Sequence, residues 1–226
     1  MPFAMLYDCD GTLVDSEYIA GTVCADALTA LGYPMTMAAF NARFNGIPAA
    51  KTWEMLRKEL PFELPEGFNA RINAEIHRLM DETLEAIPGA AEAVQAIAGL
   101  QASGPRAVAS STGRPRLLKN LEKTGLAPLF GDHIYSATQV ARGKPAPDVF
   151  LFAASQIGAD PADCIVVEDS VAGVEAGMRA GMRVIGFCGA SNGVPDLDAR
   201  LKAAGAMTVV ARMADLPQAV LAVTHA

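Results

Sequence analysis

Short apolar runs alternate with helical patterns along most of this chain. Runs ended by polar residues or glycine are typical of buried strands, and they occur at residues 3–9, 106–110, 164–168 and 182–187. Weaker versions occur at 133–136 and 207–210. Between these runs, helical patterns occur at 89–100, 114–126, 147–158 and 171–181. Strands that alternate with helices predict an α/β fold with a doubly wound parallel sheet, covered on both faces.

Residues 17–85 interrupt this alternation. They carry one helical pattern after another, punctuated by GYP, NGIP and LPFELPEG, without a strand-like run. A wholly helical block between the first two strands indicates a domain inserted into the core. We therefore predict a core domain at residues 1–16 and 86–226 and an α-helical domain at residues 17–85.

Composition narrows the class of protein. The chain has 226 residues, of which 51% are hydrophobic and 19% are charged, as in globular proteins. Its net charge of −7 gives no basic field for nucleic acid or an anionic membrane. Four scattered cysteines without a C-x-x-C pair favour buried thiols over a zinc site. With no secretory signal and no long apolar window, we expect a cytoplasmic protein, either a monomer or a weak homo-oligomer.

Polar side chains follow the predicted strands. Ligands of open parallel sheets bind beyond the carboxyl ends of the strands, so these residues are candidates for one site. In chain order, the strands are followed by Asp8 and Asp10, by Ser110 and Ser111, by Lys144 in ARGKPAP, and by Glu168 and Asp169.

Asp8 and Asp10 lie two residues apart, so on an extended strand their side chains share a face. Their mutual repulsion is relieved by a divalent cation, and Mg²⁺ prefers such hard oxygen ligands. A solvated acidic turn is the alternative for this pair taken alone. A calcium-binding EF-hand loop is excluded, because Leu13 and Ile19 stand where it needs glycine and glutamate.

Ser110 and Lys144 are candidate phosphate ligands. Ser110 precedes a predicted helix that Pro115 opens, and hydroxyls with free N–H groups at a helix start can cradle an anion. Helix capping is the alternative role. Lys144 precedes Pro145, which favours extended backbone and a fixed position. A mobile surface lysine is the alternative there. The glycines at 173, 177 and 181 predict close packing of their helix on the sheet.

Four motifs in this order resemble those of the haloacid dehalogenase superfamily, and the resemblance spans essentially the whole chain. They are DCDGTLVDSE, VASSTG, ARGKPAPDVF and VVEDSVAGVEAGMRAG. The resemblance implies a Rossmann-like core. The helical block is similar to the cap of the β-phosphoglucomutase-like subgroup, and within that subgroup the chain is most similar to 6-phosphogluconate-type phosphatases.

Residue roles follow from this resemblance. It implies that Asp8 is the nucleophile, forming an aspartyl-phosphate, and that Asp10 is the general acid and base. The implied phosphate ligands are Ser110, Ser111 and Lys144. The implied Mg²⁺ ligands are Asp8, the backbone carbonyl of Asp10, Asp169 and, through water, Glu168.

The implied activity is Mg²⁺-dependent hydrolysis of a small phosphorylated metabolite, namely a sugar, polyol or sugar-acid phosphate. A β-phosphoglucomutase-like phosphotransferase is the alternative. Those mutases carry a cap histidine five residues beyond the aspartate that matches Asp15, where this chain has Ala20. A non-catalytic phospho-aspartate switch is less favoured, since such receiver domains lack a cap and are about half as long.

The helical block should supply selectivity, as lids do. Its candidates are Arg43, Gly46 and Lys51, where a cation could meet a second acidic group of the substrate. A solvated helix face is the alternative for Arg43 and Lys51. Trp53 and His77 are interpreted as structural.

Overall fold

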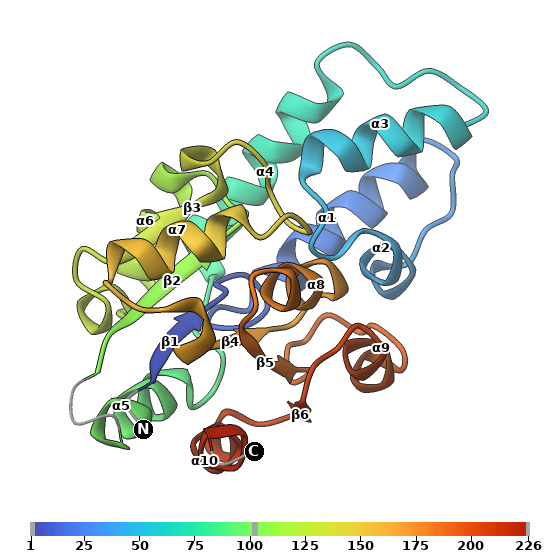
Figure 1. Cartoon of the computed structure of the whole chain (residues 1–226). Coiled ribbons are helices and arrows are strands. Elements are labelled where there is room, and N and C mark those ends of the chain that lie inside the picture. The colour runs from blue at the N-terminus through green and yellow to red at the C-terminus, as the bar shows by residue number, and fades with distance from the viewer. Residues whose placement is uncertain (1–2, 101–103, 225–226) are drawn as a thin grey trace.

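The computed structural model describes residues 3–100 and 104–224. Its six strands form one parallel sheet in the order β3-β2-β1-β4-β5-β6, as the α/β pattern predicts (Figure 1). Both weaker runs form edge strands. The strand bounds are β1 Ala4–Tyr7, β2 Arg106–Ser110, β3 Ile134–Ser136, β4 Cys164–Glu168, β5 Arg183–Phe187 and β6 Thr208–Val210.

Helices cover both faces of the sheet. On one face lie α5 (Ala90–Leu100), α6 (Arg114–Lys123) and α10 (Leu216–Thr224), and on the other lie α7 (Asp148–Gln156), α8 (Val171–Arg179) and α9 (Leu197–Ala203). Met5 and Tyr7 of β1 belong to the first hydrophobic cluster, whereas Ala4 and Leu6 belong to the second. This alternation buries β1 on both faces, and the polar residues Asp8 and Asp10 come after its end. The sequence pattern did not predict α9 and α10.

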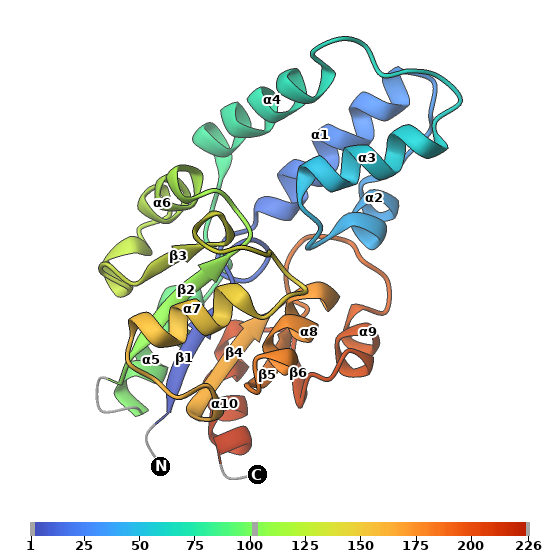
Figure 2. The same cartoon turned by 45° about the horizontal axis from the view of Figure 1, so that its top comes forward.

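The segment between β1 and α5 forms four helices with their own hydrophobic cluster, which includes Leu28, Leu56 and Phe68. The helices are α1 (Ser16–Ala30), α2 (Met37–Phe44), α3 (Ala49–Glu59) and α4 (Phe68–Thr83). Figure 2 shows them at the end of the sheet toward which the strands point. This packing supports our proposal that residues 17–85 are a cap domain on a core of residues 1–16 and 86–226. Residues 1–2, 101–103 and 225–226 of that core lie outside the described residues.

The chain leaves and re-enters the core at neighbouring points. After β1, Gly11 adopts φ +73° in a tight turn, and the amides of Leu13 and Val14 donate to the carbonyl of Cys9. The Asp15 amide then donates to the carbonyl of Glu85, where the cap ends. The Ile87 amide also donates to the carbonyl of Leu13, so the two connections lie side by side.

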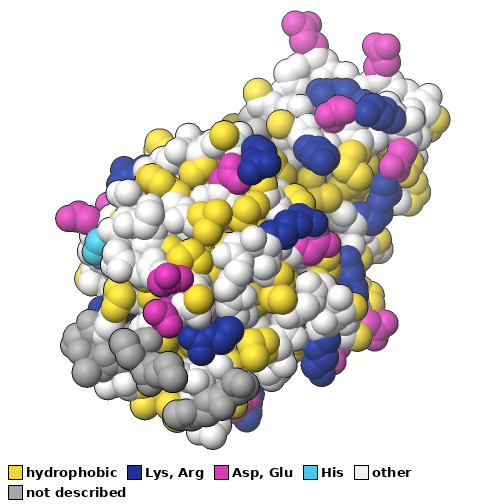
Figure 3. All heavy atoms as spheres, viewed as in Figure 1, with side chains coloured by type: hydrophobic (Ala, Val, Ile, Leu, Met, Phe, Trp, Pro, Cys, Tyr) yellow, Lys and Arg dark blue, Asp and Glu magenta, His cyan; other side chains and the backbone are white. Residues whose placement is uncertain are grey.

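The surface carries both signs of charge. On the face in Figure 3, Lys and Arg side chains are interspersed with Asp and Glu. Among the described residues, none of the helices combines the length and hydropathy needed to cross a bilayer.

Candidate active site

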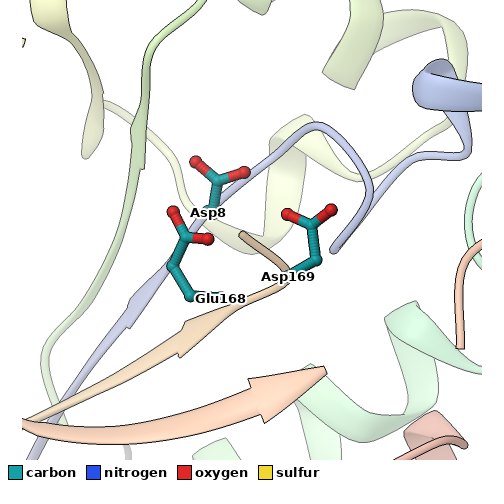
Figure 4. Close-up of side chains that lie close together, drawn as sticks. All are labelled: Asp8, Glu168 and Asp169. Carbon is teal, nitrogen blue, oxygen red and sulfur yellow. The ribbon is translucent and has the colours of Figure 1, made fainter. Parts of the chain in front are cut away.

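Three carboxylates converge beyond the ends of β1 and β4. The strands pair with Tyr7 beside Val167, so Asp8, which follows β1, lies next to Glu168, the last residue of β4, and Asp169 comes next. Figure 4 shows the three side chains close together, with their carboxylates extending to the same side. One oxygen from each lies within 4.8 Å of the others, and all three residues are buried. A solvated acidic turn is thus excluded for Asp8.

Lys144 reaches into this cluster. Its Nζ donates to Asp8 Oδ1, to Glu168 Oε1 at 2.7 Å and to the carbonyl of Ala109 at 3.1 Å. The residue is only 5% exposed, so it is not a mobile surface lysine. One ammonium therefore links the carboxylates of two adjacent strands.

The cluster holds more negative charge than Lys144 balances. Burial raises the pKa of Asp8 well above its usual value, and the charges of Glu168 and Asp10 add to this effect while Lys144 opposes it. Burial and neighbouring carboxylates also raise the pKa of Asp169. Burial disfavours the charged form of Lys144, but Asp8 and Glu168 outweigh it and raise the pKa. A hard divalent cation would supply the missing charge, so this donor set fits Mg²⁺.

The side chain of Asp10 is held separately from the cluster. Its Oδ1 accepts a hydrogen bond from Ser16 Oγ at 2.7 Å, and its Oδ2 accepts from Thr112 Oγ1 at 2.7 Å and from Ser110 Oγ at 3.2 Å. The cluster of possible metal ligands among the described residues does not include this carboxylate. Metal binding by the backbone carbonyl of Asp10 stays a prediction.

Ser110 and Ser111 lie where β2 meets α6. Ser110 is fully buried, and its Oγ also accepts from the amide of Thr112 at 3.0 Å. Ser111, Thr112 and Gly113 line the cavity described below, ahead of the helix start at Arg114. Ser110 itself is not among the described residues that line the cavity. Its hydroxyl instead forms hydrogen bonds with Asp10 and with the amide of Thr112, shortly before α6.

A cavity of about 440 Å³ extends from the carboxylates into the cap. Ser111, Thr112 and Lys144 line its floor, and most of its upper wall is apolar. That wall includes Phe40, Phe44, Ile47, Trp53, Ile76 and Met80. Trp53 is 2% exposed and stacks edge-on against Phe68, so it belongs to the cap core as interpreted while it also borders the cavity.

The three cap candidates differ in position. Gly46 lines the cavity, and a Cβ added there would lie 2.6 Å from Ser170 Oγ, which explains why glycine suits this approach. Arg43 instead forms a half-exposed ion pair with Glu59, and Lys51 is exposed. Neither Arg43 nor Lys51 is among the described residues that line the cavity. Both thus occupy a solvated helix face in this structure.

Sequence reasoning missed other cavity residues. The amide of Asn45 donates to Asp169 Oδ2 at 3.1 Å, directly before Gly46 in the NGIP segment. Glu17 lines the cavity, where burial, Asp10 and Glu168 raise its pKa to about 8. Arg116, Asn120 and His77 also line it, so the structural interpretation of His77 was incomplete. For Arg116, the sequence offered one signal of a place at the site: this residue lies in the predicted helix that follows Ser110.

The glycines of α8 have two separate roles. A Cβ at Gly177 would lie 2.7 Å from Val184 Cγ2, so this glycine allows close packing on β5, as predicted. A Cβ at Gly173 would overlap the carboxylate of Glu168. The expectation that all three glycines serve packing is therefore wrong for Gly173, which makes room for the site. It is also wrong for Gly181, which lies beyond the end of α8 at φ +75° with nothing within 4 Å of its Cβ position.

The fold and the site define a class of enzyme: a doubly wound α/β core with carboxylates and a lysine at the carboxyl edge of its sheet, beneath inserted helices. The chain belongs to the haloacid dehalogenase-like hydrolases, because the model of this family matches residues 5–187. It is therefore a hydrolase by family.

Named relatives and solved structures agree with this assignment. The 6-phosphogluconate phosphatase of Escherichia coli is 32% identical over 82% of this chain and 82% of its own length. A haloacid dehalogenase-like protein of unknown function from Agrobacterium tumefaciens has a TM-score of 0.90 at 37% identity, covering 99% of this chain and 100% of its own. A hydrolase of this family from Deinococcus radiodurans, with bound phosphate and sodium, has a TM-score of 0.82 at 35% identity, covering 99% and 96%.

Proposed function

We propose that this protein is a Mg²⁺-dependent phosphatase, which hydrolyses a small sugar, polyol or sugar-acid phosphate through an aspartyl-phosphate on Asp8. The observation that carries the proposal is the buried ammonium of Lys144, bonded to Asp8 and Glu168 at the floor of a 440 Å³ cavity. Similarity to a 6-phosphogluconate phosphatase and to a phosphate-bound hydrolase supports it.

In the first step, a carboxylate oxygen of Asp8 attacks the phosphorus of the substrate. A P–O bond forms to Asp8, and the bond between phosphorus and the ester oxygen breaks. Asp10 donates a proton to the departing oxygen, which leaves as an alcohol. Lys144, beside Asp8, neutralises charge on the phosphoryl oxygens, and such neutralisation and positioning supply most of the catalysis in phosphoryl transfer.

In the second step, water attacks the phosphorus of the aspartyl-phosphate. Asp10, now a carboxylate, accepts a proton from that water, and the bond between phosphorus and Asp8 breaks. Inorganic phosphate leaves, and both aspartates return to their starting states. The three hydroxyl donors on Asp10 hold its carboxylate in one orientation for both proton transfers.

The residues that would hold Mg²⁺ are Asp8, Asp169 and Glu168, with the backbone carbonyl of Asp10 as a further predicted ligand. When bound, the ion would neutralise negative charge on the phosphoryl group and keep the carboxylates ionised.

Hydrolysis is favoured over mutase transfer by the cavity lining. Ala20 lines the cavity, and it occupies the position at which the resembling mutases carry their cap histidine. An alanine can neither donate nor accept a proton, so a second phosphoryl acceptor would lack its base there.

The proposal is tested by measuring phosphate release from a panel of phosphorylated metabolites, with Mg²⁺ and with EDTA. We expect release only with Mg²⁺ and a loss of at least about 1,000-fold in Asp8→Asn. Asp26→Asn, an exposed aspartate of α1, is the matched control and should keep full activity. Undiminished release by Asp8→Asn would reject the nucleophile. Conversion of glucose 1-phosphate to glucose 6-phosphate without free phosphate would establish the mutase instead.

A further inference from the structure

Arg116 of α6 lies at the seam between core and cap, on the wall of the substrate cavity. Its Nη1 donates to Asp81 Oδ1 at 2.7 Å and to the carbonyl of His77 at 3.4 Å, both in α4. Its Nε donates to Asn120 Oδ1 at 2.7 Å. The side chain is 12% exposed, so these contacts hold the guanidinium in a fixed position.

Arg116 and Asn120 each have one side-chain donor without a hydrogen-bond acceptor among the described residues. Arg116 Nη2 and Asn120 Nδ2 are buried and have no hydrogen-bond partner among the described residues. Asn120 is fully buried, and both residues line the cavity. Buried donors without acceptors destabilise a folded protein, so an adjacent pair of them calls for an external acceptor. An oxygen-bearing group in the cavity would provide one.

The charges around this pair leave a positive excess. Lys119 Nζ binds the second oxygen of Asp81 at 2.6 Å, so Arg116 and Lys119 share a single carboxylate. At the floor of the cavity, by contrast, Asp8, Glu168 and Asp169 outnumber Lys144. The cavity therefore has a floor suited to a phosphoryl group with its cation and a separate wall suited to an anion.

We propose that Arg116 and Asn120 are specificity-determining residues that bind a carboxylate at the end of the substrate remote from its phosphate, so that the substrate class is the phosphorylated sugar acids. This inference rests on the proposed phosphatase activity. Arg116 supplies a cationic N–H and Asn120 a neutral one to the two carboxylate oxygens, and arginine suits planar carboxylates better than a point charge does. A single excess positive charge matches a carboxylate rather than a doubly charged second phosphate.

The test compares two substrates that differ only at the remote end. In 6-phosphogluconate that end is a carboxylate, whereas in glucitol 6-phosphate it is a hydroxymethyl group. We expect kcat/KM of the wild type to favour the acid by roughly 10- to 100-fold, the range of a charge-assisted hydrogen bond. Arg116→Gln should lose most of this preference, mainly through KM for the acid, while the alcohol changes less than about threefold. Arg116→Lys should retain part of it.

Arg114→Gln is the matched control, because Arg114 is exposed on the same helix and outside the described cavity lining. It should leave the preference unchanged. A test on the wild type does not depend on the folding of a variant: gluconate should inhibit hydrolysis of p-nitrophenyl phosphate at a concentration at least tenfold below that required of glucitol.

Equal effects of Arg116→Gln on both substrates, or equal inhibition by gluconate and glucitol, would overturn the inference. Such a result would indicate that ordered water, and not a substrate carboxylate, accepts the hydrogen bonds of Arg116 and Asn120. In that case phosphate release from glucitol 6-phosphate would still support the phosphatase. Release from no phosphate ester by the wild type would instead reject the proposed function itself.

Discussion

The side-chain amide of Asn45 donates a hydrogen bond to Asp169 Oδ2 over 3.1 Å. Asn45 ends α2 of the cap, and Asp169 is one of the three carboxylates of the core cluster. The next residue, Gly46, approaches Ser170 closely. The cap thus meets the core at the predicted metal ligand, so cap position and site geometry depend on the same few contacts.

Gly46→Ala should displace the cap from the site. The added Cβ would lie 2.6 Å from Ser170 Oγ, and the backbone at φ +76° disfavours alanine. We expect kcat/KM for phosphate release to fall roughly tenfold. Gly32→Ala is the control, because Gly32 has φ +84° but nothing within 4 Å of its Cβ position. If the two variants lose equal activity, backbone strain and not the cap contact is responsible.

Thr112→Val should misplace the general acid, because it removes a 2.7 Å hydrogen bond to Asp10 Oδ2. With alkyl phosphates we expect kcat to fall roughly tenfold at nearly constant KM. With p-nitrophenyl phosphate, whose leaving group needs no proton, the loss should shrink to less than about threefold if breaking of the ester bond limits the rate. Thr83→Val, at an exposed threonine, should change neither rate. The same loss with both leaving groups would contradict a role through Asp10.

Lys144→Met should destabilise the metal-free protein. It leaves Asp8 and Glu168 buried without their shared cation, and breaking a buried pair in this way costs about 3–5 kcal/mol in the free energy of unfolding. Urea unfolding in EDTA measures this loss, and added Mg²⁺ should restore part of it. Lys58→Met removes only an exposed i,i+4 pair with Glu54 and should cost less than about 0.5 kcal/mol. Comparable losses of unfolding free energy in the two variants would contradict the predicted contribution of the buried contacts of Lys144 with Asp8 and Glu168.

The stability of the metal-free protein should fall as pH rises between about pH 5 and pH 8, because burial raises the pKa of Glu17 from 4.5 to about 8. Asp8 and Asp169 have raised pKa values in the folded protein, since burial disfavours their charged forms, whereas in the unfolded chain they titrate near 3.8. Their contribution to stability is therefore complete below that value and is lost as pH rises through the folded values. Asp81 and Asp148, whose pKa values are lowered, are ionised in both states throughout this window.

Thermal unfolding in EDTA and in Mg²⁺ across this window checks the sign. Stabilisation by Mg²⁺ should grow with pH, because ionised carboxylates bind the cation without first losing protons. Asp8→Asn should flatten the pH dependence in EDTA. Metal-free stability that instead increases with pH across the window would show that these carboxylates ionise more easily in the folded protein than in the unfolded chain.

Local patterns in the sequence predicted much of the core. All six strands form where apolar runs occur, since a strand buried on both faces needs consecutive apolar residues. Residues at the ends of those strands or directly after them, such as Glu168 and Asp8, converge as expected because parallel strands end at one edge. The pattern missed α9 and α10.

Residues of the cap were predicted less well for a physical reason. Arg43, Lys51 and Arg116 are all cations in helical patterns, and a helix repeats every 3.6 residues whether a side chain faces solvent or a cavity. Only the packing of α4 against α6 turned Arg116 inward, and only the pairing of Arg43 with Glu59 directed that residue outward.

The sequence by itself determined the parallel sheet, the helical insertion and the chemistry at the strand ends, because these depend on short-range periodicity and on chain order. The tertiary structure alone decided the burial of Lys144, the separate support of Asp10 and the two unpaired donors on the cavity wall. Those features depend on contacts between segments far apart in the chain, such as Lys144 with Asp8 or Thr112 with Asp10. Residue types and spacing do not encode such distances, which arise only when the layers pack.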